Sequence, residues 1–162
     1  MSAPDSSGAD AANDRLIVSL YEAMNRGDGE AMAACYHPEA RFSDPAFGEL
    51  RGEEVKNMWR MLTERGDELE VELREHQATS DSGSAHWIAR YPFGNAKRPV
   101  VNDIRARYRF RDGLIAEHDD TFDLRRWAAQ AMGTPGKVLG FTPLLSPLVR
   151  RTARGQLAKF EG

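Results

Sequence analysis

Residues 36–52 read YHPEARFSDPAFGELRG, and this stretch decides how the first half of the chain folds. Pro38 predicts the end of a helix, because proline cannot continue one. Side chains alternate along a strand, so Ala40, Phe42 and Asp44 should share one side of the strand that follows. A carboxylate on the apolar side of a strand is costly unless it is paired, hydrated or functional. Asp44 is therefore the first candidate for a catalytic group.

Helical patterns lie on both sides of this strand. Residues 1–12 are small and polar, which predicts a disordered N-terminus. Apolar residues then recur at helical spacing between Leu16 and Met24, and Asp28 can cap a second, shorter helix. A third helix is predicted over residues 53–64, because its apolar residues form one stripe: Val55, Met58, Trp59 and Leu62.

After Gly66 the apolar period changes to two, which is typical of half-exposed antiparallel strands. Asp112 and Gly113 predict a tight hairpin between the last two strands. Helices followed by a long meander predict an α+β fold, in which three N-terminal helices pack on a curved antiparallel sheet. The result is a cone with an apolar interior, which suits a small apolar ligand.

With these elements in order, the chain resembles the nuclear transport factor 2-like superfamily, in its SnoaL-like and ketosteroid-isomerase-like branch. The resemblance covers residues 13–127 and is carried by LYEAMNRGD, by residues 36–52 and by YRFRDGLIAEH. It implies a cone-shaped fold, a ligand inside the cone, and a homodimer formed across the outer face of the sheet. The superfamily includes enzymes of many activities and members with none, so the fold does not fix the function.

The resemblance also implies roles for single residues. Asp44 falls where the ketosteroid isomerases carry their general base. The positions of their two oxyanion donors fall on Leu20 and Ala106, which cannot donate hydrogen bonds from their side chains. Tyr21 is one residue away from the first of these, about 100° around the helix. Steroid isomerisation itself is therefore not predicted.

The last strand offers other polar groups. In LIAEHDDTFD, alternation predicts that Ala116, His118, Asp120 and Phe122 face inward. His118 and Asp120 are predicted to form an acid–base cluster with Asp44. In this cluster Asp44 takes a proton or activates water, His118 returns a proton and Asp120 orients the imidazole. The SnoaL-like polyketide cyclases and the limonene-epoxide-hydrolase relatives use pocket acids in this general way. The residues predicted to contact the substrate are Tyr21, Trp59, Trp87, Tyr108 and Phe122.

Each of these assignments has a structural alternative. The carboxylate of Asp44 can accept backbone N–H groups of its own turn. His118 and Asp120 can be a buried hydrogen-bonded pair without a catalytic role. A metal site is not expected, because residues 117–120 hold one histidine and alternate between the two faces. No cofactor is predicted, and the alternative function is a non-catalytic ligand-binding or dimeric scaffold protein.

Composition narrows the class of protein. A net charge of −3 predicts no general affinity for nucleic acid. No apolar run approaches the ~20 residues that span a bilayer. The N-terminal residues lack a basic segment followed by an apolar one, so no secretion signal is expected. Cys35 is the one cysteine, which excludes an internal disulfide, and a cytoplasmic location is predicted.

The C-terminal residues 128–162 are predicted to form a basic amphipathic extension. Seven Lys and Arg residues against one Glu give residues 124–162 a charge of +6, which leaves −9 on residues 1–123. Such a tail can lie on an anionic membrane surface, or dock on the acidic body as a lid or across a dimer. Docking is favoured, because several apolar residues need cover: Leu139, Phe141, Leu144 and Leu145.

Overall fold

The computed structural model of the protein describes residues 6–64 and 68–162. The three predicted N-terminal helices are present as α1 (Ser6–Asn25), α2 (Gly29–Ala33) and α3 (Glu53–Glu64). The side chain of Asp28 caps α2 by accepting the backbone N–H of Ala31 at 2.9 Å. Because α1 begins at Ser6, the prediction of disorder is wrong for residues 6–12, while residues 1–5 lie outside the described residues.

Long-range contacts hold the N-terminal half of α1 against the sheet. Asn13 is buried, and its side-chain amide donates to the carbonyl oxygens of Thr79 at 2.9 Å and Ser80 at 3.1 Å. At the next residue, Asp14 Oδ1 lies 2.7 Å from His76 Nδ1. Tertiary contacts of this kind outweigh the weak helix propensity of small polar residues, which is why local composition did not predict the start of α1.

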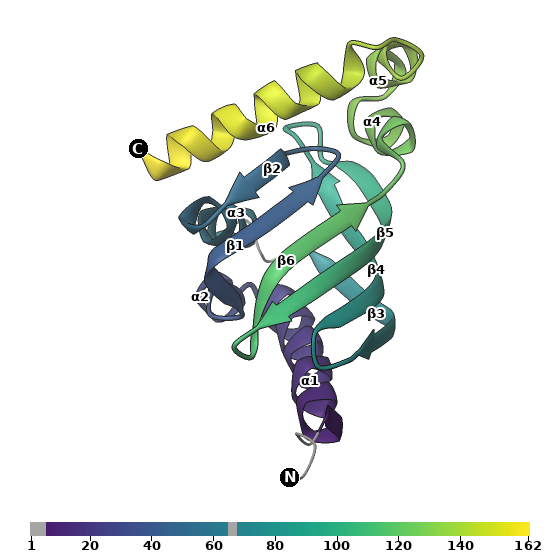
Figure 1. The fold of residues 1–162 in the computed structure, drawn as a ribbon. Helices are drawn as coiled ribbons and strands as arrows, with labels where there is room; N and C mark the ends of the chain where they lie inside the picture. Colours follow the sequence, from purple (N-terminus) through teal and green to yellow (C-terminus); the bar gives the residue numbers. More distant parts are fainter. Residues whose placement is uncertain (1–5, 65–67) are drawn as a thin grey trace, which may run out of the picture.

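Six strands form one curved sheet in the order β2-β1-β6-β5-β4-β3 (Figure 1). They are β1 (Tyr36–Asp44), β2 (Gly48–Arg51), β3 (Glu70–Ala78), β4 (Ser82–Phe93), β5 (Arg98–Arg111) and β6 (Leu114–Thr121). The expectation of a wholly antiparallel sheet is wrong, because β1 and β6 run parallel and the sheet is mixed. These two strands come from distant parts of the chain, so no hairpin forces them into opposite directions.

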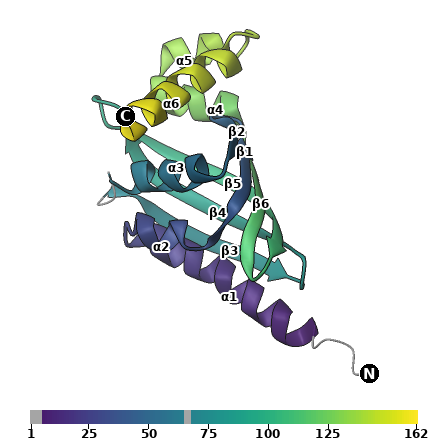
Figure 2. The same ribbon diagram turned by 60° about the vertical axis from the view of Figure 1, so that its left-hand side comes forward.

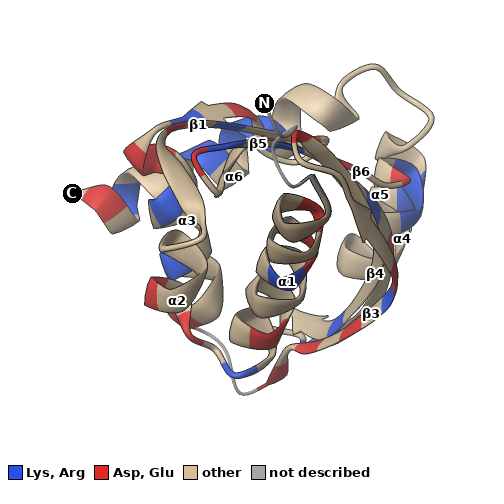
Figure 3. Cartoon of the chain, turned by 60° about the horizontal axis from the view of Figure 1, so that its bottom comes forward, with Lys and Arg blue, Asp and Glu red and all other residues tan. Residues whose placement is uncertain are grey.

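The helices lie on the concave side of the sheet. Figure 2 shows α1 and α3 on this side, and Figure 3 shows α1 within the curve of the strands. The longest strand, β5, explains the packing: its alternate residues from Val100 to Phe110 are buried against the helices, while the residues between them are exposed. The predicted stripe of α3 faces the same interior through its buried residues Val55, Met58 and Trp59. The prediction is wrong for its fourth member, because Leu62 is exposed and Met61 is buried in its place. This is the predicted cone-shaped α+β fold.

Strand β6 contains one extra residue near its start. Glu117 pairs with Arg109 of β5, whereas Ile115 pairs with the very next residue, Phe110. Ala116 is therefore bulged, and such a bulge shifts the alternation by one residue. Ile115 is fully buried and Ala116 only partly so, which makes the predicted inward orientation of Ala116 wrong. The residues after the bulge keep the predicted alternation, with His118 and Asp120 facing inward.

Three further helices follow the last strand: α4 (Leu124–Met132), α5 (Thr134–Leu139) and α6 (Leu145–Glu161). They gather at the end of the cone opposite the N-terminus (Figures 1 and 2). Leu157 of α6 is buried in the main core. The guanidinium of Arg154 donates to the backbone carbonyls of Phe47, at 2.9 Å, and Glu49. The predicted C-terminal helical extension is thus present as α4, α5 and α6.

No helix within the described residues is both long and apolar enough to cross a membrane.

Candidate functional site

The register between β5 and β6 brings the candidate site together. Tyr108 lies opposite His118, and Ala106 lies opposite Asp120. Directly opposite residues on one face of an antiparallel pair have side chains in contact range. His118 is fully buried and Asp120 is 5% exposed, so both point into the cone as the alternation predicts. The register therefore places an imidazole, a carboxyl group and a phenol side by side in the interior.

His118 is the centre of a buried hydrogen-bonded chain. Its Nε2 lies 2.8 Å from Asp120 Oδ1, and its Nδ1 lies 2.8 Å from the hydroxyl of Tyr36. A neutral imidazole that donates from Nε2 to the Asp120 carboxylate accepts the Tyr36 proton at Nδ1, which satisfies all three groups. This buried chain, Tyr36–His118–Asp120, is the centre of the candidate site.

Aromatic rings enclose the imidazole on several sides. The ring centre of His118 lies 4.5 Å from that of Tyr108, 5.0 Å from that of Phe42 and 6.1 Å from that of Trp59. Trp59 is contributed by α3 and the other two rings by the sheet. Sequence reasoning placed Trp59 and Tyr108 here, but it missed Tyr36. Tyr36 has the same parity as Ala40 and Phe42, which is the signal that could have found it.

Tyr21 and Tyr108 form a second polar pair in the interior. Both side chains are buried, and their hydroxyl groups share a hydrogen bond. Burial raises the pKa of each well above its ordinary value, and the charge of Asp120 raises both further. Tyr36 is affected in the same way, with burial as the largest cause of its raised pKa. The three phenols therefore stay protonated at neutral pH and can act as hydrogen-bond donors.

Asp44 lies at the end of β1, where the chain turns into β2. Its Oδ1 accepts the backbone N–H groups of Ala46 at 2.9 Å and Phe47 at 2.5 Å. Burial raises the pKa of Asp44 to about 7, the nearby charge of Asp120 raises it, and the two backbone hydrogen bonds and His118 oppose the increase. The side chain remains partly exposed, so Asp44 sits at the rim of the interior with a proton that exchanges near neutrality.

Two indole N–H groups in the interior lack an acceptor. Within the described part of the chain, Trp59 Nε1 and Trp87 Nε1 are the buried side-chain polar atoms with no hydrogen-bond partner. Trp59 Nε1 is close enough to Tyr36 to affect its pKa, yet it falls outside hydrogen-bond geometry. The ring of Trp87 lies 5.1 Å from that of Tyr21. A buried donor without a partner is costly, so each one marks a place where an acceptor would be stabilised.

The C-terminal helices close the rim of the cone near Asp44. Phe122 is half-buried and contacts both the main core and a smaller cluster formed by α4 and α6. Ala46, in the turn that follows Asp44, contacts the same two clusters. Trp127 Nε1 on α4 donates to the hydroxyl of Tyr91 on β4 at 2.8 Å. Phe122 therefore lies at the boundary between the cone and its extension, rather than deep in the interior.

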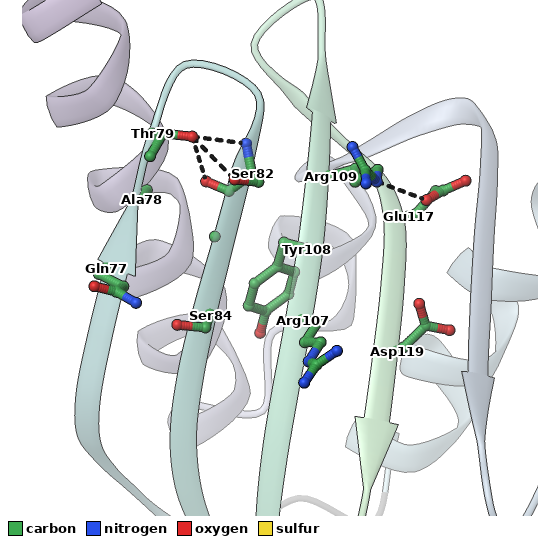
Figure 4. A pocket seen from close by; sticks show the side chains of 11 residues that line it. Gln77, Ala78, Thr79, Ser82, Ser84, Arg107, Tyr108, Arg109, Glu117 and Asp119 are labelled. Carbon is green, nitrogen blue, oxygen red and sulfur yellow. Dashed lines mark hydrogen bonds and ion pairs between the residues drawn. The ribbon is translucent and has the colours of Figure 1, made fainter.

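Two surface hollows lie on the opposite, outer face of the sheet. They have volumes of about 500 Å³ and 820 Å³, and both are lined by Gln77, Ser84, Arg107 and Asp119. Figure 4 shows Arg107 and Arg109 on β5 next to Asp119 and Glu117 on β6. These side chains belong to the outward-facing positions of the strands. A ligand pocket inside the cone therefore stays a prediction.

The interior offers no metal site of the usual kind. Among residues 6–64 and 68–162, no group of three His, Cys, Asp or Glu side chains is arranged to hold a metal ion. Cys35 is buried, which raises the pKa of its thiol to about 11. The buried phenols and the unpaired indole N–H groups can donate hydrogen bonds to an acceptor.

Comparison with known proteins shows what the chain is similar to. No curated protein matches it significantly in sequence. Among solved structures, a candidate polyketide cyclase from Xanthomonas campestris is 20% identical, with a TM-score of 0.62 over 76% of this chain and 98% of that one. An epoxide hydrolase of Mycobacterium tuberculosis, described as LEH-like, is 16% identical, with a TM-score of 0.63 over 85% of this chain and 98% of that one.

A third structure comes from Catenulispora acidiphila. It has a ketosteroid-isomerase-like fold with bound trimethylamine, and it is 19% identical, with a TM-score of 0.63 over 79% of this chain and 97% of that one. At these identities the three structures share the fold with the present chain. Residues 17–118 match the model of the SnoaL-like domain. Since this match spans more than half of the 162 residues, the chain belongs to the SnoaL-like domain family.

Proposed function

We propose that the protein binds a small, mostly apolar molecule inside its cone and acts on it as an isomerase, cyclase or hydrolase, by acid–base chemistry without a cofactor. The observation that carries this proposal is the buried chain Tyr36–His118–Asp120 beside the carboxyl group of Asp44. Titratable groups at this depth cost folding free energy, and their concentration in one place is typical of active sites.

Asp44 is the proposed general base or water activator. With a pKa of about 7, roughly half of the molecules carry the carboxylate at neutral pH, and the conjugate acid is strong enough to return the proton. A base acts best when its pKa lies near the working pH. The partial exposure of Asp44 at the rim leaves it accessible to a substrate or a water molecule.

His118 is the proposed proton donor, and Asp120 is the residue that positions it. The carboxylate of Asp120 at 2.8 Å from Nε2 fixes the ring and stabilises the protonated imidazole. The hydroxyl of Tyr36 forms a second hydrogen bond with the imidazole, at Nδ1. Both ring nitrogens are engaged, so the proton returned to the substrate leaves the protonated imidazole through the Tyr36 hydroxyl, which gives up its own proton as it accepts one from Nδ1.

Tyr21 and Tyr108 are proposed to bind the substrate oxygen. In a pair of phenols that share one hydrogen bond, one hydroxyl donates to the other, and the second keeps its own proton for an outside acceptor. A donor held in a dry interior stabilises a developing negative charge on a carbonyl or epoxide oxygen. Asp120 lies opposite Ala106, so an inward carboxyl group is present beside the position where the ketosteroid isomerases carry their oxyanion acid.

The unpaired indole N–H groups of Trp59 and Trp87 support a ligand with hydrogen-bond acceptors. Their rings and that of Phe122 supply apolar area, so the proposed ligand is mostly hydrocarbon with one or two oxygens. The names of the similar structures, a candidate polyketide cyclase and an epoxide hydrolase, agree with this ligand class at the level of the fold.

The test is ligand-induced thermal stabilisation against a panel of apolar ketones, enones, lactones and epoxides. A ligand that binds the folded state alone must raise the melting temperature. Wild type is compared with Asp44→Asn, and Asp119→Asn is the matched control, since it is the same substitution on the outer face. We expect hits whose shift changes in Asp44→Asn and is unchanged in the control, and those hits are then assayed for turnover. Turnover that survives Asp44→Asn would refute the role of Asp44.

The second candidate is a non-catalytic binding protein. One observation favours it: the Asp44 carboxyl accepts two backbone N–H groups, as a residue with a purely structural role in the turn would do. This alternative predicts hits in the thermal panel that are the same for wild type and Asp44→Asn, and no turnover of any of them. A flat panel for both proteins would favour a scaffold.

We further propose that the protein is a homodimer through the outer face of the sheet. The two hollows on this face contain Arg105 and Arg107, and among the described residues neither has a carboxylate partner in its own chain. A second copy can supply that partner from its acidic body. Light scattering coupled to gel filtration measures the mass, and a monomer at micromolar concentration would contradict this proposal.

A further inference from the structure

The C-terminal extension presents a cluster of exposed apolar side chains at one extremity of the molecule. Most of the large apolar residues with high exposure lie here, and Phe141 is the most exposed of them at 81%. We call this cluster the apolar tip, and its members are Val138, Phe141, Leu144 and Leu148. Figures 1 and 2 show α5 and the start of α6 at the far end from the N-terminus. Large exposed apolar side chains gathered on one segment mark an interaction surface.

Cationic side chains surround the apolar tip. The guanidinium carbon of Arg125 lies 4.4 Å from the ring centre of Phe141. Lys137 immediately precedes the exposed Val138 on α5. Arg151 follows Leu148 at a spacing of one helical turn, which places these two side chains on a shared face of α6. We call Arg125, Lys137 and Arg151 the basic collar.

The basic collar has no internal counter-charge. All three of its side chains are exposed, and no carboxylate in the described part of the chain pairs with any of them. Within residues 124–162 the one acidic residue is Glu161, at the far end of α6. The collar is therefore available to an external anion.

We propose that the apolar tip and the basic collar form a docking site for an anionic lipid surface. Two interactions bind a peripheral protein to such a membrane. Apolar side chains enter the boundary between headgroups and acyl chains, and cations around them are attracted to the anionic headgroups. The charge distribution sets the orientation: the extension carries +6, while residues 1–123 carry −9 and are repelled from the surface.

A second copy of the chain fits this surface less well. A stable protein interface uses about 20 to 30 residues on each side, whereas the apolar tip has four side chains and protrudes at the end of the molecule. Insertion into a soft lipid interface needs no complementary pocket. The shape of the tip therefore favours a membrane as its occupant.

Docking of the tail on the body and docking on a membrane use opposite sides of the same segment. Leu157 of α6 is buried in the main core, and Leu145 and Val149 are buried in the smaller cluster with α4, which Ala46 and Phe122 join to the body. Leu144 and Leu148 point away from that contact and are exposed. The two alternatives that the sequence offers for the tail are thus compatible. The surface also lies outside residues 17–118, which match the family model, and it does not depend on the proposed chemistry of the interior.

The test is co-sedimentation of the full chain with vesicles. One set is made of phosphatidylcholine alone, and the other of equal parts of phosphatidylcholine and phosphatidylglycerol. We expect binding to the mixed vesicles, little binding to the neutral ones, and weaker binding at high salt. Phe141→Ser with Leu144→Ser should abolish it, whereas the matched control Leu62→Ser with Val101→Ser, at exposed apolar positions elsewhere, should leave it unchanged.

The charge term is tested separately. Lys137→Gln with Arg151→Gln removes two collar cations and should weaken binding to the mixed vesicles about thirtyfold, as expected for two cations near an anionic surface. Arg15→Gln with Arg26→Gln removes the same charge from exposed positions on α1 and just after it, away from the tip, and should have little effect. All four variants should melt at the wild-type temperature, because the substituted side chains are exposed.

Three outcomes would overturn the proposal. Wild type that stays in the supernatant with mixed vesicles at low salt excludes the site. Equal losses in the collar variant and in its control would assign binding to net charge alone. A dimer that Phe141→Ser with Leu144→Ser converts to a monomer, with vesicle binding unaffected, would assign the tip to a second copy.

Discussion

Two neighbouring aspartates on β6 have opposite surroundings. Asp119 points outward and accepts hydrogen bonds from both terminal nitrogens of Arg41, at 2.9 Å and 2.8 Å, and from the hydroxyl of Ser43. Arg41 holds the pKa of Asp119 below its ordinary value. Asp120 points inward, is 5% exposed, and contacts the imidazole of His118.

One strand therefore presents a stabilising carboxylate on its outer face and a candidate functional carboxyl group on its inner face. The outer carboxylate, Asp119, is paired with the permanent cation of Arg41, so it stabilises the fold and is not available to a substrate. The inner carboxyl group faces an imidazole and phenols whose protons can move, which makes it expensive to bury and useful for chemistry. If this is correct, substitutions on the two faces of β6 should differ in size, and in their dependence on pH.

The largest expected effect is on the inner face. His118→Ala removes the ring that joins Tyr36 and Asp120, leaving both polar groups buried without partners beside a new cavity. We expect the free energy of unfolding to fall by about 3–5 kcal/mol, measured by urea denaturation. Asp120→Asn, which keeps an acceptor for Nε2, is the control and should cost less. A loss below about 1 kcal/mol for His118→Ala would mean that the interior is hydrated.

The next effect is a pH dependence from Asp44. Its folded pKa of about 7 lies above the ordinary value of 3.8, so the folded state holds the proton more tightly than the unfolded one. Wild type should therefore lose stability as the pH rises from about 4 to 7, by about 2 kcal/mol after allowance for partial exposure. Asp44→Asn should remove this slope and be the more stable protein at pH 8. Parallel profiles for the two proteins would contradict the raised pKa.

Asp119 should show the opposite sign. Its folded pKa is lowered, so its contribution is present at pH 7 and is lost as the pH falls through that folded pKa. We expect Asp119→Asn to cost about 1 kcal/mol at pH 7, in unfolding experiments, and to match wild type once the pH falls below that folded pKa. A cost that persists in acid would mean that shape, and not charge, holds Arg41 in place.

The smallest effect belongs to Glu117, the other outward carboxylate of β6. It lies 3.5 Å from Arg109 and 4.0 Å from Arg41, in pairs that solvent reaches. Exposed pairs of this geometry contribute little, so Glu117→Gln should change the free energy of unfolding by less than about 0.5 kcal/mol. Raising the salt concentration should erase what difference there is. A larger change would show that Glu117 has an additional partner, such as a second copy on the outer face.

Local pattern was enough for much of the fold. The cap at Asp28, the apolar stripe of α3 and the alternation of β5 each depend on residues within a few positions of one another, and each is present. The inward phase of His118 and Asp120 also follows from alternation. Their catalytic roles, like that of Asp44, stay predictions.

The rest depends on contacts between distant residues. The parallel pairing of β1 with β6 has no local signature, since strand direction is set by the whole chain. The Tyr21–Tyr108 hydrogen bond joins residues 87 positions apart, and Tyr36 reaches His118 across 82 positions. A sequence pattern can place each phenol on a buried face, but it cannot say which hydroxyl meets which partner.

The bulge at Ala116 has a consequence for comparing this chain with its relatives. An alignment that runs through β5, the hairpin and β6 without a gap assumes a regular ladder, and in a relative without the extra residue every position beyond it would be displaced by one. Asp119 would then be equated with the relative's inward residue, and an outer ion pair would be taken for a pocket acid. A single gap at Ala116 restores the correspondence, so homologues of this site are recognised correctly by superposed strands rather than by residue counting.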